Sequence, residues 1–178
     1  MRRRPFSSNR HKESAQKLEA AGAEGLVICT NTMHRMADEV QAAVSIPLIH
    51  IADATAEAVK SAGSSRPALL ATRFTMEQDF YKGRLAERHG LEAIVPDAAG
   101  RDMVHRVIYE ELCRGVVSET SRAAYIAEVD RLRRDDGIDS VIMGCTEITM
   151  LIGQDDFDIP VFDTTRIHAE AAVEFALG

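Results

Sequence analysis

Two cysteines occupy equivalent positions in the pattern of this sequence. Cys29 ends one short apolar run and is followed by Thr30, and Cys145 ends another run far along the chain and is followed by Thr146. Such runs predict buried strands, and each cysteine therefore lies where a strand should give way to a helix. Because a helix N-terminus lowers the pKa of a nearby thiol, both cysteines are candidates for acid-base chemistry near neutral pH.

A pair of thiols could invert a stereocentre by proton transfer, because one thiolate would remove hydrogen from one face of a carbon while the other thiol delivers hydrogen to the opposite face. The two sulfurs should then face each other across a crevice, within about 10 Å. Taken singly, Cys29 and Cys145 could each be packing residues. A further alternative makes one of them a nucleophile that isomerises or decarboxylates a small diacid.

Short apolar runs alternate with segments of helical periodicity along most of the chain. The predicted strands are residues 25–29, 47–51, 69–71, 93–95, 140–143 and 161–162. The predicted helices are residues 33–44, 53–63, 75–89, 101–114, 119–134, 147–152 and 164–177. N-caps are expected at Asp53, Ser118 and Asp163, and glycines 63, 90 and 137 should end helices.

This alternation predicts an α/β fold with two pseudo-symmetric lobes, in which parallel sheets are flanked by helices. The first lobe is expected to comprise residues 13–63 plus 161–178, and the second residues 64–160. Residues 1–12 form a basic head that should be a frayed, solvated terminus. Chemistry in such folds lies beyond the carboxyl ends of the strands.

Composition narrows the classes of partner. The 178 residues carry a formal net charge of -7, although Arg2, Arg3, Arg4, Arg10 and Lys12 all precede the first acid. The chain that follows these basic residues is therefore strongly acidic, and it should repel nucleic acid and anionic membrane surfaces. An odd cysteine count without a CxxC pair suits a reducing cytoplasm. The glycines, lysines and histidines form no cofactor or metal motif, so neither a cofactor nor a metal is expected.

Three segments carry a resemblance to a known family. They are Cys-Thr-Asn-Thr-Met-His at 29–34, Leu-Leu-Ala-Thr-Arg-Phe-Thr at 69–75 and Gly-Cys-Thr-Glu at 144–147. They resemble the aspartate racemases, of the cofactor-independent aspartate/glutamate/hydantoin racemase superfamily, and the similarity runs from about residue 13 to 178. The resemblance implies that Cys29 and Cys145 are the catalytic acid-bases and that the substrate is a small amino acid, aspartate or glutamate.

The same resemblance implies which residues bind the carboxylates or ammonium of that amino acid: Thr30, Asn31, Thr32, Thr72, Thr75 and Thr146. Glu147 stands where glutamate racemases resemble one another in having histidine, which implies the aspartate type. Glu147 could contact the substrate ammonium, assist proton transfer or simply favour its helix. Relatives also resemble one another in being homodimers, so a homodimer is expected.

One departure from the family pattern is expected to matter. Relatives begin with a glycine-rich strand that this sequence lacks, so the first lobe should be truncated at its N-terminus. A shortened and catalytically silent paralogue is therefore a third hypothesis beside the two enzymatic ones.

Three further residues have competing interpretations. His34 is expected on a helix surface rather than at the crevice, and Cys113 is expected to pack inside a helix. Arg73 could pair with a carboxylate on the substrate side chain, or it could be solvated.

Overall fold

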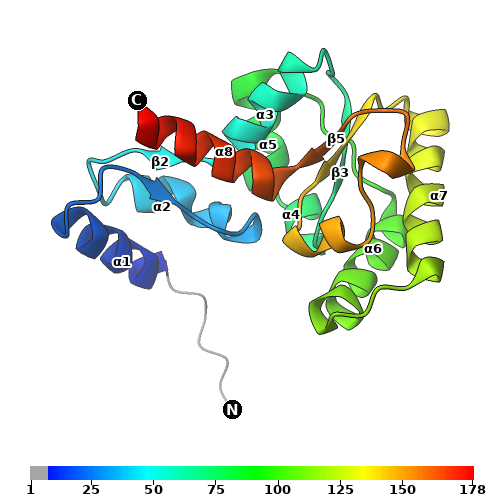
Figure 1. Cartoon of the computed structure of the whole chain (residues 1–178), viewed down its shortest axis with the longest axis horizontal. Coiled ribbons are helices and arrows are strands. Elements are labelled where there is room, and N and C mark those ends of the chain that lie inside the picture. The colour runs from blue at the N-terminus through cyan, green and yellow to red at the C-terminus, as the bar shows by residue number, and fades with distance from the viewer. Residues whose placement is uncertain (1–7) are drawn as a thin grey trace.

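The computed structural model describes residues 8–178, in which five strands form two parallel sheets (Figure 1). The smaller sheet pairs β1 (Leu26–Val27) with β2 (Leu48–Ile49). The larger sheet has the order β3–β4–β5, made of Pro67–Leu70, Ser140–Met143 and Val161–Asp163. Two parallel sheets flanked by helices confirm the predicted fold class.

The helices cover both sides of the larger sheet. In Figure 1, α7 lies on one side of this sheet while α3 and α8 lie on the other, and α8 continues across β2 of the smaller sheet. The α-helices are α1 (Ser8–Ala20), α2 (Ala37–Gln41), α3 (Ile51–Ser61), α4 (Arg73–Glu77), α5 (Asp79–His89), α6 (Ala98–Glu110), α7 (Glu119–Asp136) and α8 (Thr164–Leu177). Short 3-10 helices are η1 (Thr32–Met36), η2 (Leu112–Arg114), η3 (Thr146–Met150) and η4 (Gln154–Asp156).

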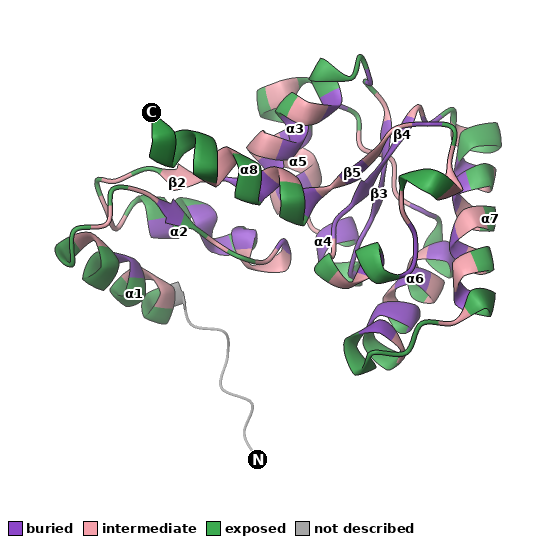
Figure 2. Ribbon diagram, viewed as in Figure 1, coloured by how far each residue is buried: buried purple, intermediate pink, exposed green. Residues whose placement is uncertain are grey.

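The main hydrophobic core surrounds the larger sheet. β3 and β4 are buried along their whole length, whereas the C-terminal end of α8 is exposed (Figure 2). A second, smaller cluster of Ala15, Leu26 and Val40 joins α1, β1 and α2. Among the described residues, no helix is both long enough and apolar enough to cross a membrane.

Several helix ends follow from local sequence. Ser118 caps α7 and Asp163 caps α8, each with a side-chain oxygen that accepts backbone N–H groups. Gly90 and Gly137 end α5 and α7 with φ of 68° and 67°, a left-handed conformation that glycine adopts without strain. These four predictions are confirmed.

The predicted cap at Asp53 is wrong, because His50 caps α3 by accepting the Ala52 N–H at its ring nitrogen. Asp53 lies inside the helix and is engaged elsewhere. Its two carboxylate oxygens each accept a hydrogen bond from Arg84 at 2.6 Å, and His89 contacts the same carboxylate at 2.9 Å.

Other elements are shorter than the periodicity suggests. The helix expected over 75–89 is divided into α4 and α5 at Gln78, whose ψ of 151° is extended. The segment expected as a strand at 93–95 makes only an isolated bridge from Ile94 to Ala68. The strands expected over 25–29 and 47–51 pair with each other along only two residues each.

The lobe boundaries also differ from those predicted. Residues 161–163, assigned to the first lobe, form β5 and pair with β4 in the larger sheet. The chain returns to the smaller sheet only afterwards, along α8. Residues 8–12 of the expected frayed head form the first turns of α1, which are stabilised by an ion pair from Lys12 to Glu39 at 3.3 Å. Residues 1–7 lie outside the described residues.

Candidate active site

A cavity of about 380 Å³ opens where the ends of β1, β3 and β4 approach one another. Both cysteines singled out from the sequence, Cys29 and Cys145, line it. Of the predicted binding residues, all except Thr75 line it too; they are Thr30, Asn31, Thr32, Thr72, Thr146 and Glu147. The lining also includes Met33, Ile108, Tyr109, Cys113 and Gly144.

Gly144 brings Cys145 to the cavity. Its N–H donates to the Leu70 carbonyl at 2.8 Å, which holds the end of β4 against β3. A Cβ atom at Gly144 would lie 2.8 Å from Leu69 Cδ1 and 3.0 Å from Ala71 Cβ, so a larger residue would have to displace these side chains. Cys145 follows immediately and is the N-cap residue of η3.

The turn that carries Cys29 is held from behind by His34. Nδ1 of this histidine lies 2.9 Å from the Thr30 carbonyl, and Nε2 accepts the Ile51 N–H at 3.2 Å. With Nε2 accepting, Nδ1 carries the proton and donates to Thr30. His34 is only 2 % exposed, so its predicted place on a helix surface is wrong.

His34 belongs to a buried cluster of histidines. Its ring centroid lies 4.5 Å from that of His50 and 5.6 Å from that of His168, and His168 Nε2 donates to the Ile49 carbonyl at 2.7 Å. Burial lowers the pKa of His34 to about 4 and that of His50 to about 3. A neutral His34 ring therefore supports the Cys29 turn at neutral pH.

Three threonine hydroxyls form a triangle beside this turn. Thr32 Oγ1 lies 3.2 Å from Thr72 Oγ1 and 3.1 Å from Thr75 Oγ1, and the latter two are 3.3 Å apart. Thr32 and Thr72 line the cavity, whereas Thr75 is fully buried behind them. The prediction that Thr75 contacts the substrate is therefore not supported by its position; it orients the other two hydroxyls.

Asn31 joins the Cys29 turn to the larger sheet. Its Nδ2 donates to Thr164 Oγ1 at 3.0 Å, and that hydroxyl donates to the Met143 carbonyl at 2.8 Å. The other amide atom, Oδ1, is buried and has no hydrogen-bond partner in the structure. Such an acceptor is costly to bury alone and is available to a ligand that donates a hydrogen bond.

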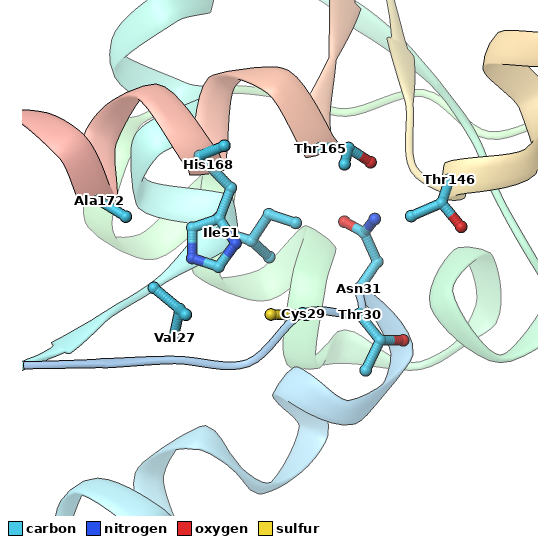
Figure 3. A pocket seen from close by; sticks show the side chains of 10 residues that line it. Val27, Cys29, Thr30, Asn31, Ile51, Thr146, Thr165, His168 and Ala172 are labelled. Atoms are coloured by element: carbon cyan, nitrogen blue, oxygen red, sulfur yellow. The ribbon is translucent and has the colours of Figure 1, made fainter.

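A second cavity, of about 320 Å³, adjoins the first and shares Cys29, Thr30, Asn31 and Thr146 with it. Figure 3 shows the Asn31 amide between Thr165 and Thr146, and the His168 ring beside Ile51. Cys29 and Asn31 thus line both cavities, and the second of these is mainly apolar.

The second cysteine is paired with a carboxylate. Cys145 Sγ donates to Glu147 Oε2 at 2.9 Å, and Thr146 Oγ1 donates to the same oxygen at 2.7 Å. Burial, reinforced by the hydrogen bond and negative charge of Glu147, raises the pKa of Cys145 to about 12. Burial acts to raise the pKa of Glu147, but the two hydrogen bonds outweigh it and the pKa is lowered.

The expectation that a helix N-terminus lowers the Cys145 pKa is therefore wrong. η3 has only five residues, so its dipole is small. The neighbouring carboxylate and the loss of solvent both favour the neutral thiol. In the structure Cys145 is the proton donor and Glu147 is the charged acceptor.

Cys113 is the principal residue that the sequence interpretation missed. It lies in η2, is exposed and lines the cavity, so its assignment to packing is wrong. Tyr109, four residues earlier on α6, lines the same wall, and this i, i+4 spacing was the available signal. Arg73 does not line the cavity, because it pairs with Asp102 at 2.6 Å.

The Cys145–Glu147 pair makes a measurable prediction. In Glu147→Gln the anion beside the thiol is lost, so the pKa of Cys145 should fall, although burial keeps it above the ordinary value for cysteine. The pH dependence of Cys145 alkylation by iodoacetamide, read by mass spectrometry of the peptide, should therefore shift to lower pH. Because the charge of Glu147 also contributes to the raised pKa of Cys113, the Cys113 profile should shift in the same direction. An unchanged Cys145 profile would contradict the pairing.

Within residues 8–178, no group of three or more histidine, cysteine, aspartate or glutamate side chains is arranged to hold a metal ion. The chemistry that these residues can perform themselves is proton transfer by thiols and a carboxylate, beside hydroxyl and amide groups suited to an amino acid.

Comparisons with known proteins identify the family. The model of the family described as Asp/Glu/Hydantoin racemase matches residues 6–172. The structure is similar to that of a candidate Asp/Glu racemase from Yersinia pestis, with a TM-score of 0.92 and 52% identity, covering 96% of this chain and 74% of that one. It is also similar to an aspartate racemase homologue from Pyrococcus horikoshii, with a TM-score of 0.88, 36% identity and the same coverages.

A more distant relative is described as having broad specificity. The broad specificity amino-acid racemase RacX from Bacillus subtilis is 20% identical over 167 residues, which is 90% of this chain and 68% of that protein.

Proposed function

Because this chain belongs to the Asp/Glu/hydantoin racemase family, we propose that it racemises an α-amino acid by moving the α-proton between Cys29 and Cys145. The observation that carries the proposal is that the two thiols line one cavity together with hydroxyl, amide and carboxylate groups. Members of this family are isomerases. The two-cysteine mechanism, the substrate and independence from pyridoxal phosphate are part of the proposal.

The protonation states of the two thiols set the order of the proton transfers. Cys145 begins as a neutral thiol, so Cys29 acts as the thiolate that breaks the Cα–H bond and becomes S–H. Cys145 then gives its proton to the opposite face of the carbanion and is left as a thiolate beside Glu147. The reverse direction starts from this form, in which Cys29 is the thiol and Cys145 is the thiolate, so the protons balance in both directions. Between turnovers Cys29 releases its proton to solvent and Cys145 takes one up, which restores the 2.9 Å hydrogen bond to Glu147.

Binding groups are available for the parts common to all amino acids. The unpartnered Oδ1 of Asn31 suits the α-ammonium group, which would satisfy this buried acceptor. The hydroxyls of Thr32 and Thr72 suit the α-carboxylate, because the third hydroxyl, on Thr75, fixes their orientation from behind.

The side chain of the substrate is less defined by these groups. The sequence resemblance favours the aspartate type, and this remains a prediction. The printed descriptions of the relatives include both Asp/Glu and broad-specificity racemases.

The test is conversion of single enantiomers by the purified chain, followed by chiral chromatography. We expect each enantiomer of a substrate to approach a racemic mixture without added cofactor. Aminooxyacetate, which traps pyridoxal phosphate, should leave the rate unchanged. If no amino acid is converted, or if a diacid is isomerised or decarboxylated instead, the proposal is wrong.

A further inference from the structure

One wall of the candidate active site has no role in the two-thiol reaction. It comes from the end of α6 and from η2, and consists of Ile108, Tyr109 and Cys113. Ile108 is buried, whereas Tyr109 is 48 % exposed and Cys113 is exposed. η2 packs against η3, which follows Cys145, so this wall lies beside the reacting thiols.

The groups of this wall are uncharged at neutral pH. Burial raises the pKa of Tyr109 and of Cys113, in both cases with a further contribution from the negative charge of Glu147 or a nearby thiol. His105 stacks beside Tyr109 with ring centroids 4.7 Å apart, and burial lowers its pKa. The wall therefore offers an apolar surface, a phenol and a thiol.

Apart from the proposed Cys29 thiolate, Glu147 is the only charged side chain among those that line the cavity in the described part of the chain, and both charges are negative. The nearest arginines along the sequence are directed elsewhere. Arg73 pairs with Asp102 at 2.6 Å and Arg106 lies 3.7 Å from Glu111, while Arg114, next to Cys113, is exposed and does not line the cavity.

These charges distinguish classes of amino acid. The α-ammonium and α-carboxylate are common to all candidates and cancel in a comparison between them. The side-chain carboxylate of aspartate or glutamate would lose water in the cavity without gaining a cation, and it would be repelled by Glu147. An uncharged side chain avoids both costs and gains apolar contact with Ile108 and the Tyr109 ring.

We propose that Ile108, Tyr109 and Cys113 form the side-chain subsite, and that the preferred substrates are amino acids with uncharged side chains, such as methionine or homoserine, rather than dicarboxylic ones. This inference rests on the proposed racemase function. It replaces the aspartate-type substrate expected from the sequence, and it makes Cys113 a residue that determines specificity.

The experiment compares kcat/KM for racemisation of methionine and homoserine with that of aspartate and glutamate. We expect wild-type protein to prefer the uncharged pair by about 100-fold or more. Cys113→Lys places a cation on the wall, so kcat/KM for aspartate should rise about tenfold or more while that for methionine falls. Cys113→Ala is the matched control, which removes the thiol without adding charge, and should show no gain with aspartate.

A wild-type preference for aspartate or glutamate would overturn the inference, as would an equal gain with aspartate in Cys113→Ala and Cys113→Lys. Circular dichroism of each variant confirms that it is folded. If wild-type protein racemises no amino acid, the proposed function fails, and calorimetric titration with methionine and with aspartate still tests the subsite. Tighter binding of aspartate would then contradict it.

Discussion

Replacing either Cys29 or Cys145 by serine should reduce racemisation in both directions by about 10³-fold or more, because general acid-base steps of this kind contribute 10²–10⁴-fold each. One thiol must remove the α-proton while the other supplies a proton to the opposite face. A serine hydroxyl is too weak an acid to replace a thiol. The measurement is the initial rate from each pure enantiomer.

Elimination from a substrate with a β-leaving group, such as β-chloroalanine, separates the two roles. That reaction needs only a base on the correct face, so each single variant should retain it with one enantiomer. Cys29→Ser and Cys145→Ser should retain it with opposite enantiomers. Cys113→Ser removes the third thiol of the cavity and should still racemise in both directions. Undiminished racemisation by either active-site variant would contradict the two-base assignment.

Acidification should begin to destabilise this protein below about pH 6.5, before ordinary carboxylates titrate. Folding lowers the pKa of His34 from 6.5 to about 4 and that of His50 to about 3. Between these values and 6.5 the unfolded chain binds protons that the folded chain excludes, so stability is complete above pH 6.5 and falls as the pH falls below it. Between pH 7.5 and 4.5, the lowered pKa of each ring should reduce the free energy of unfolding by about 2.5 kcal/mol.

Urea unfolding at several pH values measures this slope. The neighbouring charged and titratable groups are His168, Arg84 and Asp53. In Asp53, burial opposes ionisation but hydrogen bonds from Arg84 and His89 lower the pKa, so its own contribution is lost only at lower pH. His50→Asn keeps a side chain that can cap α3 while removing one titrating ring, and should reduce the slope by about half. A variant slope equal to that of wild type would refute the assignment to these histidines.

The parts of the fold that sequence predicts well depend on local chemistry. The strand at 140–143 matches β4 because four apolar or small residues are buried on both faces of a parallel sheet. Ser118 and Asp163 cap their helices through contacts within three residues. Glycine at 90 and 137 ends helices through its own backbone freedom.

The parts that sequence misses depend on distant contacts. Nothing local to His34 indicates that it bonds to Ile51 at the start of α3. Likewise, the place of β5 is set by pairing with β4, not by its position between a loop and α8. The position of Cys145 at a helix N-terminus could not predict its pKa, because burial in the tertiary structure raises that pKa. Cys113 joins the cavity only because η2 packs against η3.

The most direct test of the two-thiol reaction follows the α-proton itself. Wild-type protein is incubated in deuterated water with one pure enantiomer of an amino acid that it racemises, and this enantiomer carries protium at Cα. The reaction is stopped early. We expect the newly formed enantiomer to carry deuterium, because the second thiol supplies a proton derived from solvent, while the remaining starting enantiomer keeps protium. Retention of protium in the newly formed enantiomer would show transfer by a single base and would contradict the roles of Cys29 and Cys145.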